Sequence, residues 1–182
     1  LEKDYDAVFI GVGAQVGKSL PIKGASESPQ TTNAIDFLRN YEIYGDDFKI
    51  GKKVIVIGDG NVAMDVARLA RRMGSESTII SAVPREEMNC YPDEFDDAIE
   101  EGAKIEYLIG TREILTDKDD NVRGVKCSKM TKKEKGEDGW DSKIPFFRYK
   151  INEETFEIKS DMIVASIGQT TDMKGLEVAV KD

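Results

Sequence analysis

Between residues 54 and 74 the apolar residues change from a continuous run to a helical repeat. Residues 54–57 are four β-branched residues in succession, which indicates a strand buried on both faces. After this run, apolar residues recur every three or four positions, as on one face of a helix: Val62, Val66, Leu69 and Met73. Gly74 is a suitable helix end. The pattern predicts a strand, a short turn and a helix.

Similar patterns on either side of this unit predict a parallel sheet. We expect a helix over residues 34–43, capped by residues 31–33. Beyond Gly74 the expected elements are a strand at 77–82, a helix at 93–101, a strand at 104–108 and a closing strand at 162–165. The alternation of strands and helices implies parallel pairing with right-handed crossovers.

After residue 108 the pattern changes to short strands joined by polar turns. Strands are expected at 111–116, 122–130 and 144–149, forming an antiparallel meander, and residues 155–159 complete this meander or lead out of it. A short strand is expected at 7–10, and residues 19–30 read as a linker over the surface. The predicted fold class is α/β: a Rossmann-like parallel sheet with flanking helices and an antiparallel β-meander, in three layers.

The turn between the first strand and its helix carries the spacing GxGxxA. Gly58 can turn the chain tightly, and Gly60 lacks a Cβ and so lets a pyrophosphate approach the backbone. Ala63 allows the helix to pack closely on the strand, and the first amides of the helix face the phosphates. This arrangement predicts dinucleotide binding. The alternative is a glycine-rich turn in an α/β domain that binds nothing.

Composition narrows the classes of function. The 182 residues suit a single domain, and a net charge of −9 argues against nucleic acid as a partner. No apolar run is long enough to cross a membrane, and the first residues do not resemble a signal peptide, so we expect a cytoplasmic protein. The chain begins with Leu1 and soon enters a strand, which suggests a piece of a longer protein.

The chain lacks histidine, and its two cysteines are far apart. Cys90 and Cys127 form no CxxC motif, so we expect two free thiols and no metal site made by this chain alone. Without histidine the commonest general base is missing. If the chain takes part in catalysis, a cofactor therefore carries the reaction.

Four motifs resemble a known family when they are taken in order. They are GKKVIVIGDGNVAMDVAR, PREEM, DEFDDAIEEG and DMIVASIGQTTD, and the N-terminal YDAVFIGVGA fits the same pattern. Together they are similar to the small (beta) subunit of bacterial glutamate synthase and its relatives, which are FAD-dependent oxidoreductases of the pyridine nucleotide-disulphide type. The resemblance covers nearly the whole chain.

The resemblance implies that residues 1–182 are a single NAD(P)H-binding domain inserted in an FAD domain. Residues 1–30 and 161–182 would then connect to that FAD domain, which lies outside this sequence. Electrons would pass from NAD(P)H to FAD, then to iron–sulfur clusters or a partner subunit. The implied partners are the FAD domain and a large or iron–sulfur subunit. The chain alone should be inactive.

Matching positions imply where the cofactor is held. The residues around the pyrophosphate would be Gly58, Asp59, Gly60, Asn61, Val62 and Ala63. Gly168 and Gln169 match the segment at the domain junction, where nicotinamide meets flavin, and Gly11 and Gly13 match the entry side of that junction.

Two departures from the family pattern leave the choice between NAD and NADP open. Asp59 stands where the family pattern GGGN has a glycine, and a carboxylate is awkward beside phosphate unless it points away. Residues 81–83, Ser-Ala-Val, stand where a Tyr-Arg-Arg run can pair with the 2′-phosphate of NADP. Ser81 can bond a ribose hydroxyl or accommodate a phosphate. Arg85 can reach in, or it can be a solvated loop residue.

The favoured function is therefore positional. The domain is expected to hold nicotinamide against a flavin for hydride transfer, with no catalytic side chain of its own. A second hypothesis is a non-catalytic module that senses nucleotide or docks a partner. A third is a methyltransferase, which can also have a glycine-rich loop after its first strand.

Overall fold

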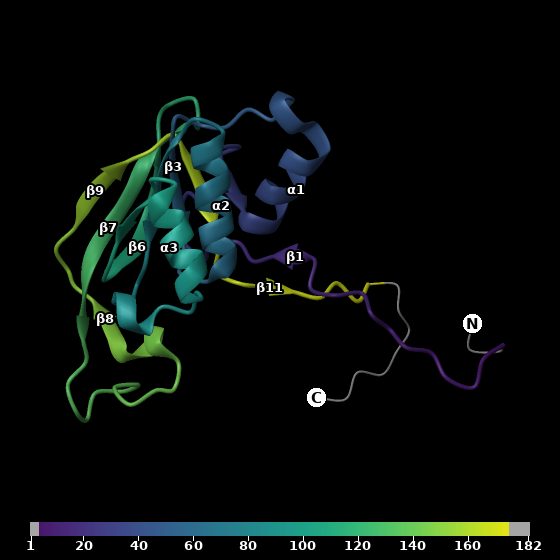
Figure 1. Cartoon of the computed structure of the whole chain (residues 1–182). Helices are drawn as coiled ribbons and strands as arrows, with labels where there is room; N and C mark the ends of the chain where they lie inside the picture. The colour runs from purple at the N-terminus through teal and green to yellow at the C-terminus, as the bar shows by residue number, and fades with distance from the viewer. Residues whose placement is uncertain (1–3, 175–182) are drawn as a thin grey trace.

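The computed structural model describes residues 4–174, and its centre is a five-stranded parallel sheet (Figure 1). The strand order is β2-β10-β3-β4-β5. The bounds are Thr31–Asn33 for β2, Lys53–Ile57 for β3, Glu76–Ile80 for β4, Lys104–Glu106 for β5 and Met162–Ala165 for β10. The closing strand β10 lies between β2 and β3. The carboxyl ends of β3 and β10, which are far apart in sequence, are therefore side by side near the centre of the sheet.

Three α-helices cover one face of this sheet. They are α1 (Ala34–Tyr44), α2 (Asn61–Arg72) and α3 (Pro92–Glu100), each within two residues of the predicted bounds. The expected cap of α1 is present, since the Asp36 amide donates to Asn33 Oδ1 at 2.9 Å. Residues 31–33 also form the edge strand β2, which the sequence pattern did not indicate.

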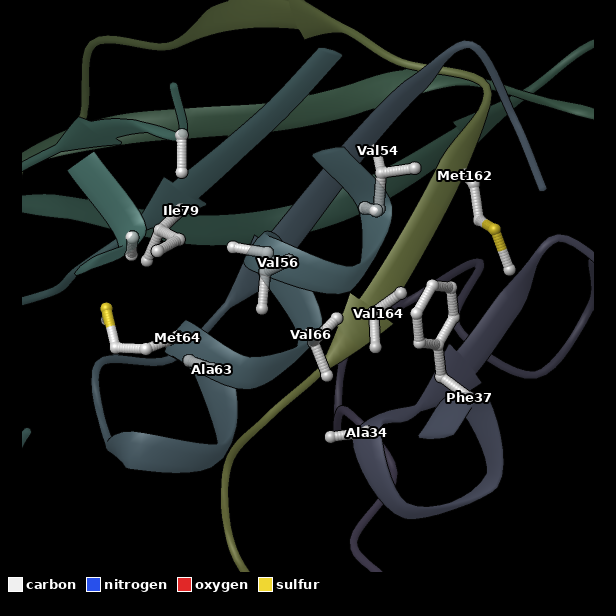
Figure 2. Packing of buried hydrophobic residues seen from close by; sticks show 14 of the residues in the cluster. Ala34, Phe37, Val54, Val56, Ala63, Met64, Val66, Ile79, Met162 and Val164 are labelled. Atoms are coloured by element: carbon white, nitrogen blue, oxygen red, sulfur yellow. The ribbon is translucent and has the colours of Figure 1, made fainter. Parts of the chain in front are cut away.

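The packing between α2 and the sheet follows the predicted apolar face. Ala63, Met64 and Val66 of α2 are fully buried, and Figure 2 shows Val66 beside Val164 of the sheet. Val56 and Val164 face them from β3 and β10. Each fully buried valine contributes roughly 1.5–3 kcal/mol relative to exposure, so this contact fixes the position of the helix N-terminus above the sheet.

An antiparallel sheet covers the other face of the parallel sheet and forms the third layer. It contains β6 (Ile109–Thr116), β7 (Val122–Lys132), β8 (Tyr149–Ile151) and β9 (Phe156–Lys159), with β6, β8 and β9 all paired to β7. Alternate residues of β3 and β10 point into this second core, among them Ile55, Ile57 and Ile163. The predicted α/β fold with flanking helices and an antiparallel meander is confirmed.

Three segments differ from the sequence prediction. Residues 7–10 form no strand, because no neighbouring strand pairs with them in the described chain, and Phe9 is 95% exposed. Residues 19–30 do not lie over the surface as a linker: Leu20 and Ala25 are buried in the second core, and a Cβ on Gly24 would lie 2.3 Å from the carbonyl oxygen of Ile114.

The third difference is at residues 144–149, where only Tyr149 belongs to a strand. Residues Pro145–Arg148 form a 3₁₀ helix, η3, and the strand β8 begins after it. Proline lacks the N–H that a ladder needs, which is the physical reason that the strand starts late. Shorter 3₁₀ helices occur at Gly45–Asp47 (η1) and Arg85–Glu87 (η2).

A two-stranded ribbon leaves the body of the domain beside α1 and α2 (Figure 1). It pairs β1 (Val16–Gly17) with β11 (Gln169–Thr170) in antiparallel register. The Lys18 amide also donates to the Gly168 carbonyl at 3.0 Å. The entering and leaving segments of the chain therefore run side by side. Of the segment expected to connect to another domain at the C-terminus, residues 175–182 lie outside the described part.

Candidate functional site

The carboxyl ends of the central strands open into a cavity of about 1030 Å³. Gly58 follows β3 and Ser166 follows β10, so the cavity lies at the crevice between two strands whose chains leave in different directions. Ligands of open α/β sheets bind at such a switch point. The volume is at the upper end of what small-molecule and cofactor sites offer, about 300–1,000 Å³.

Gly58 is required by the way β3 and β10 end. Its φ is +132°, and an added Cβ would lie 2.1 Å from the Ser166 carbonyl oxygen. Its amide donates to the Ile80 carbonyl at 3.1 Å, which ties the turn to β4. No side chain fits here, so this glycine brings the backbones of β3, β4 and β10 together at the edge of the cavity.

Gly60 has the opposite surroundings. An added Cβ would meet no atom within 4 Å, so the space beside its backbone is open. Gly60 is the N-cap of α2 and supplies no capping side chain. The first amides of a helix have no carbonyl one turn earlier to bond, and here no side chain of the cap covers them. The turn therefore fits a phosphate group, and a pyrophosphate would be held by Gly60 and the amides that follow it.

The next three residues fix the helix rather than line the cavity. Ala63 is fully buried against the sheet, and Val62 packs beside the same core. The side chain of Asn61 accepts a hydrogen bond from the Tyr91 amide at 2.8 Å, which attaches the start of α3 to the start of α2. These residues hold the helix N-terminus in place. The amides suited to a phosphate are those of Asn61 and Val62, because the Ala63 amide donates to the Gly60 carbonyl at 2.9 Å.

Asp59 does not point away from the cavity. It lines the wall, and its Oδ2 lies 3.2 Å from Ser81 Oγ while Asn89 Nδ2 lies 3.5 Å from Oδ1. Burial raises the pKa of the Asp59 carboxyl, and the hydrogen bonds from Ser81 and Asn89 offset part of this rise. The structure thus places Asp59 and Ser81 together, at the ends of β3 and β4.

The remaining residues after β4 bring no cation to the cavity. Ala82 and Val83 line it with apolar side chains. Arg85 lies in η2 with its guanidinium 3.7 Å from the centre of the Phe95 ring, a cation–π contact with α3. It does not belong to the cavity wall. Of the two readings of Arg85, this structure favours a structural loop residue over a phosphate ligand.

The two junction segments are placed differently. Gly168, with φ +102°, lines the cavity, and Gln169 follows it in β11, exposed and opposite Gly17. Gly11 and Gly13 lie further out along the entering segment and do not contribute to the wall. The structure therefore brings Gly58, Asp59, Gly60, Ser81 and Gly168 together at the carboxyl edge of the sheet, and leaves Gly11, Gly13 and Arg85 elsewhere.

The sequence reasoning missed one wall of the cavity. The connection from β7 to β8, with the start of β8, contributes an aromatic and apolar group with two lysines: Lys133, Ile144, Pro145, Phe146, Phe147 and Lys150. Lys150 pairs with Glu137 at 2.7 Å, and Lys133 donates to the Asp138 carbonyl at 2.6 Å. The signal in the sequence is the apolar run Ile-Pro-Phe-Phe directly after a charged stretch, which the strand prediction for residues 144–149 does not distinguish from a sheet residue pattern.

No helix in residues 4–174 is both long and apolar enough to pass through a membrane. The same residues contain no cluster of metal-ligating side chains of the size a metal ion needs. Cys90 and Cys127 are separate, buried thiols, and burial raises the pKa of Cys127 to about 12.

Residues 2–181 match the family model described as pyridine nucleotide-disulphide oxidoreductase. The chain belongs to this family. The pyridine nucleotide-disulphide oxidoreductases include flavin- and NAD(P)-dependent enzymes of the type suggested by the sequence motifs, and the family assignment replaces the methyltransferase alternative.

Curated members of the family are similar over almost the whole chain. The NADPH-Fe(3+) oxidoreductase subunit beta of Geobacter sulfurreducens is 34% identical over 177 residues, which is 95% of this chain. The NADP(+)-dependent formate dehydrogenase subunit beta of Moorella thermoacetica is 32% identical over 179 residues, or 97% of this chain. The chain spans only 25% and 24% of the length of these two relatives.

Solved structures of reductases share the fold. FprA, an oxidoreductase of Mycobacterium tuberculosis, superimposes with a TM-score of 0.70 at 20% identity, over 96% of this chain and 53% of that one. Thioredoxin reductase of T. acidophilum gives a TM-score of 0.61 at 19% identity, over 88% of this chain and 43% of that one. The layered arrangement of a parallel sheet, helices and antiparallel strands is thus a fold that this chain shares with these two proteins.

Proposed function

We propose that this chain is the NAD(P)H-binding module of a flavin-dependent oxidoreductase and that it positions nicotinamide for hydride transfer to a flavin. The observation that carries the proposal is the turn at Gly58–Gly60, which leads into the uncapped N-terminus of α2 at the edge of the cavity. The cavity continues to Gly168 beyond β10, so one elongated ligand can span both strand ends.

The part of this chain in the reaction is to bind and orient. Bound reduced nicotinamide supplies a hydride, which a flavin held by a neighbouring domain accepts. The backbone of the Gly60 turn holds the phosphates, and the apolar wall from β6, β7 and η3 keeps water from the bound molecule. Proximity and orientation are the contribution of such a domain, so no side chain here acts as a catalytic acid or base.

The flavin domain is proposed to join this module through residues 1–30 and 161–182, as the resemblance to the glutamate synthase small subunit implies. Within these ranges Leu20, Ala25 and β10 pack in this module, so the connections proper are the parts that lie outside them. The antiparallel pairing of β1 with β11 supports this, because it brings both connections to one place. Exposed apolar residues precede β1, among them Val8 and Phe9, and suit burial in a second domain. The resemblance also leads us to propose that the flavin passes electrons to iron–sulfur clusters or to a large subunit. The location that we propose, from the sequence pattern, is cytoplasmic.

A titration of the protein with NADH and with NADPH tests the binding role. Heat of binding with at least one nucleotide is expected, and Gly60→Val should weaken it at least tenfold, since the added side chain fills the open space beside the helix N-terminus. Glu100→Val is the matched control at an exposed position of α3 that does not line the cavity, and it should leave binding unchanged. Absence of heat with both nucleotides at millimolar concentration would contradict the proposal.

The second candidate is a non-catalytic module that senses nucleotide or docks a partner. The observation that favours it is the carboxylate of Asp59 on the cavity wall, together with the missing arginine pair after β4. Such a module would bind a partner chain while showing no hydride transfer when joined to its flavin domain, so turnover by the joined protein separates the two candidates.

A further inference from the structure

We propose that Asp59, supported by Ser81, binds the hydroxyl groups of the adenosine ribose and makes this site selective for NADH over NADPH. The inference rests on the proposed function, because it names which of the two nucleotides the module takes. The proposed preference for NADH differs from the nucleotides that the names of the two curated relatives mention, NADPH and NADP(+).

The position of Asp59 carries the first step. In dinucleotide-binding folds the adenosine ribose lies beyond the carboxyl end of the second strand of the motif, where an acidic residue bonds its hydroxyls. Here the second strand is β4, which ends at Ile80, and Ser81 follows directly. The carboxylate reaches this place from the preceding turn, since Asp59 Oδ2 lies 3.2 Å from Ser81 Oγ.

The hydrogen bonds of Ser81 leave the carboxylate with acceptor capacity. Ser81 is fully buried, and its single hydroxyl proton has the carbonyl oxygen of Val83 at 2.8 Å as its closer acceptor. The Val83 amide donates to the same hydroxyl at 3.1 Å. Asn89 also donates to Asp59, but its Nδ2 is 3.5 Å from Oδ1, so both printed side-chain bonds to this carboxylate are long. A carboxylate has about four acceptor sites, and two vicinal ribose hydroxyls are suitable donors for those that remain.

The charges around Asp59 carry the second step. A 2′-phosphate would bring a further negative charge close to the carboxylate, and repulsion at such short range is strong in a partly buried site. Ala82 and Val83 offer no countercharge, and Arg85 is engaged by the Phe95 ring.

The only cations of the described cavity wall are Lys133 and Lys150. Lys133 follows β7 and donates to the Asp138 carbonyl, while Lys150 lies in β8 and pairs with Glu137. No cation is among the groups that shift the pKa of Asp59. The site thus offers a diol an acceptor and, beside that acceptor, no described countercharge for a 2′-phosphate, which is the pattern of a site that rejects one ligand by an unfavourable charge contact.

Calorimetric titration of the 182-residue chain with NADH and NADPH tests the inference. NADH is expected to bind about 10- to 100-fold more tightly than NADPH, the range that one charge contact typically gives. Asp59→Asn should reduce this ratio at least about tenfold, mainly by improving NADPH binding. Asp119→Asn, on the exposed β6–β7 turn, removes the same net charge and should leave the ratio unchanged.

A second pair of ligands isolates the ribose from the nicotinamide. Binding of 5′-AMP and of adenosine 2′,5′-bisphosphate should show the same order as NADH and NADPH. Tighter or equal binding of NADPH by the unchanged protein would overturn the inference and leave the proposed function intact, and so would an unchanged ratio in Asp59→Asn. Absence of binding by all four ligands would overturn both.

Discussion

At the scale of the single residue, two glycines two positions apart have different physical roles. Gly58 is required by packing, because the Ser166 carbonyl occupies the space that its side chain would need. Gly60 has free space beside it, so the protein fold does not require a glycine there. The spacing GxGxxA predicted both glycines, but only the coordinates separate the one that serves the fold from the one that serves a ligand.

Alanine at these two positions should therefore separate stability from binding. Gly58→Ala is expected to lower the free energy of unfolding by about 3 kcal/mol, because it combines a backbone clash with an unfavourable positive φ. Gly60→Ala should cost less than about 1 kcal/mol, the range for exchange at an N-cap. Urea denaturation measures both values. Equal losses of stability in the two variants would contradict the argument that the Ser166 carbonyl leaves no room for a side chain at position 58.

The carboxyl group of Asp59 should reduce stability at neutral pH. Burial raises its pKa in the folded state, so the folded protein holds this proton more tightly than the unfolded chain, whose Asp pKa is about 3.9. The tighter proton binding by the folded state stabilises the fold fully below that pH, and this stabilisation is lost as the pH rises through the folded pKa of Asp59. Asp59→Asn should therefore be more stable than the unchanged protein at pH 7, with the difference shrinking toward pH 4.

Asp117 provides a control of opposite sign. Hydrogen bonds from the amides of Asp119 and Asn121 lower the pKa of Asp117 in the β6–β7 turn. Asp117→Asn should therefore lower stability at pH 7 rather than raise it. Unfolding free energies of both variants at several pH values make the comparison, and a loss of stability in Asp59→Asn at pH 7 would contradict the argument from burial.

At the scale of the element, the sequence predicted the helices and buried strands whose formation depends on a local pattern of apolar residues. The helical repeat of residues 62–73 and the β-branched run of residues 54–57 both form where expected, because each buries a continuous apolar surface. The strand predicted at 7–10 does not form in the described structure, because a strand needs a partner strand and its own residues do not specify one. The orientation of Asp59 could not be predicted either, since it depends on Ser81, which is 22 residues away in sequence.

The contact between α2 and α3 should depend on pH in the acid range. Arg68 and Arg72 of α2 bond Glu101, directly after α3, at 2.9 and 2.7 Å. These guanidinium groups lower the pKa of Glu101 to about 2. Because its pKa is lower in the folded state, the Glu101 carboxylate stabilises the fold at pH values above its unfolded pKa of about 4.3. This stabilisation is lost as the pH falls toward 2.

Glu101→Gln should remove this contribution. At neutral pH it is expected to lower the free energy of unfolding by about 1 kcal/mol, the upper range for partly exposed ion pairs, and the difference from the unchanged protein should vanish near pH 2. Glu100→Gln changes a neighbouring exposed carboxylate and should have a smaller effect. A pH-independent difference would assign the role of Glu101 to packing rather than to charge.

At the scale of the whole molecule, two separate cores make the domain complete as a folded unit. One lies between the helices and the parallel sheet, and the other between that sheet and the antiparallel layer. The chain nevertheless spans about a quarter of its curated relatives. Stability and catalytic competence should therefore separate: in the proposed architecture this chain folds and binds the nucleotide, while the flavin that accepts the hydride belongs to another domain.

The 182-residue chain alone should therefore fold and bind nucleotide but catalyse nothing. We expect the purified protein to be colourless, with no flavin absorbance band, and to reduce no dye with NADH or NADPH as donor. Fusion to a flavin domain through the β1 and β11 segments should restore dye reduction, and Gly60→Val in the fusion should abolish it while leaving the flavin band unchanged. Dye reduction by the chain alone would place a redox centre within these residues and contradict the positional role, because orientation of nicotinamide has no effect without an acceptor beside it.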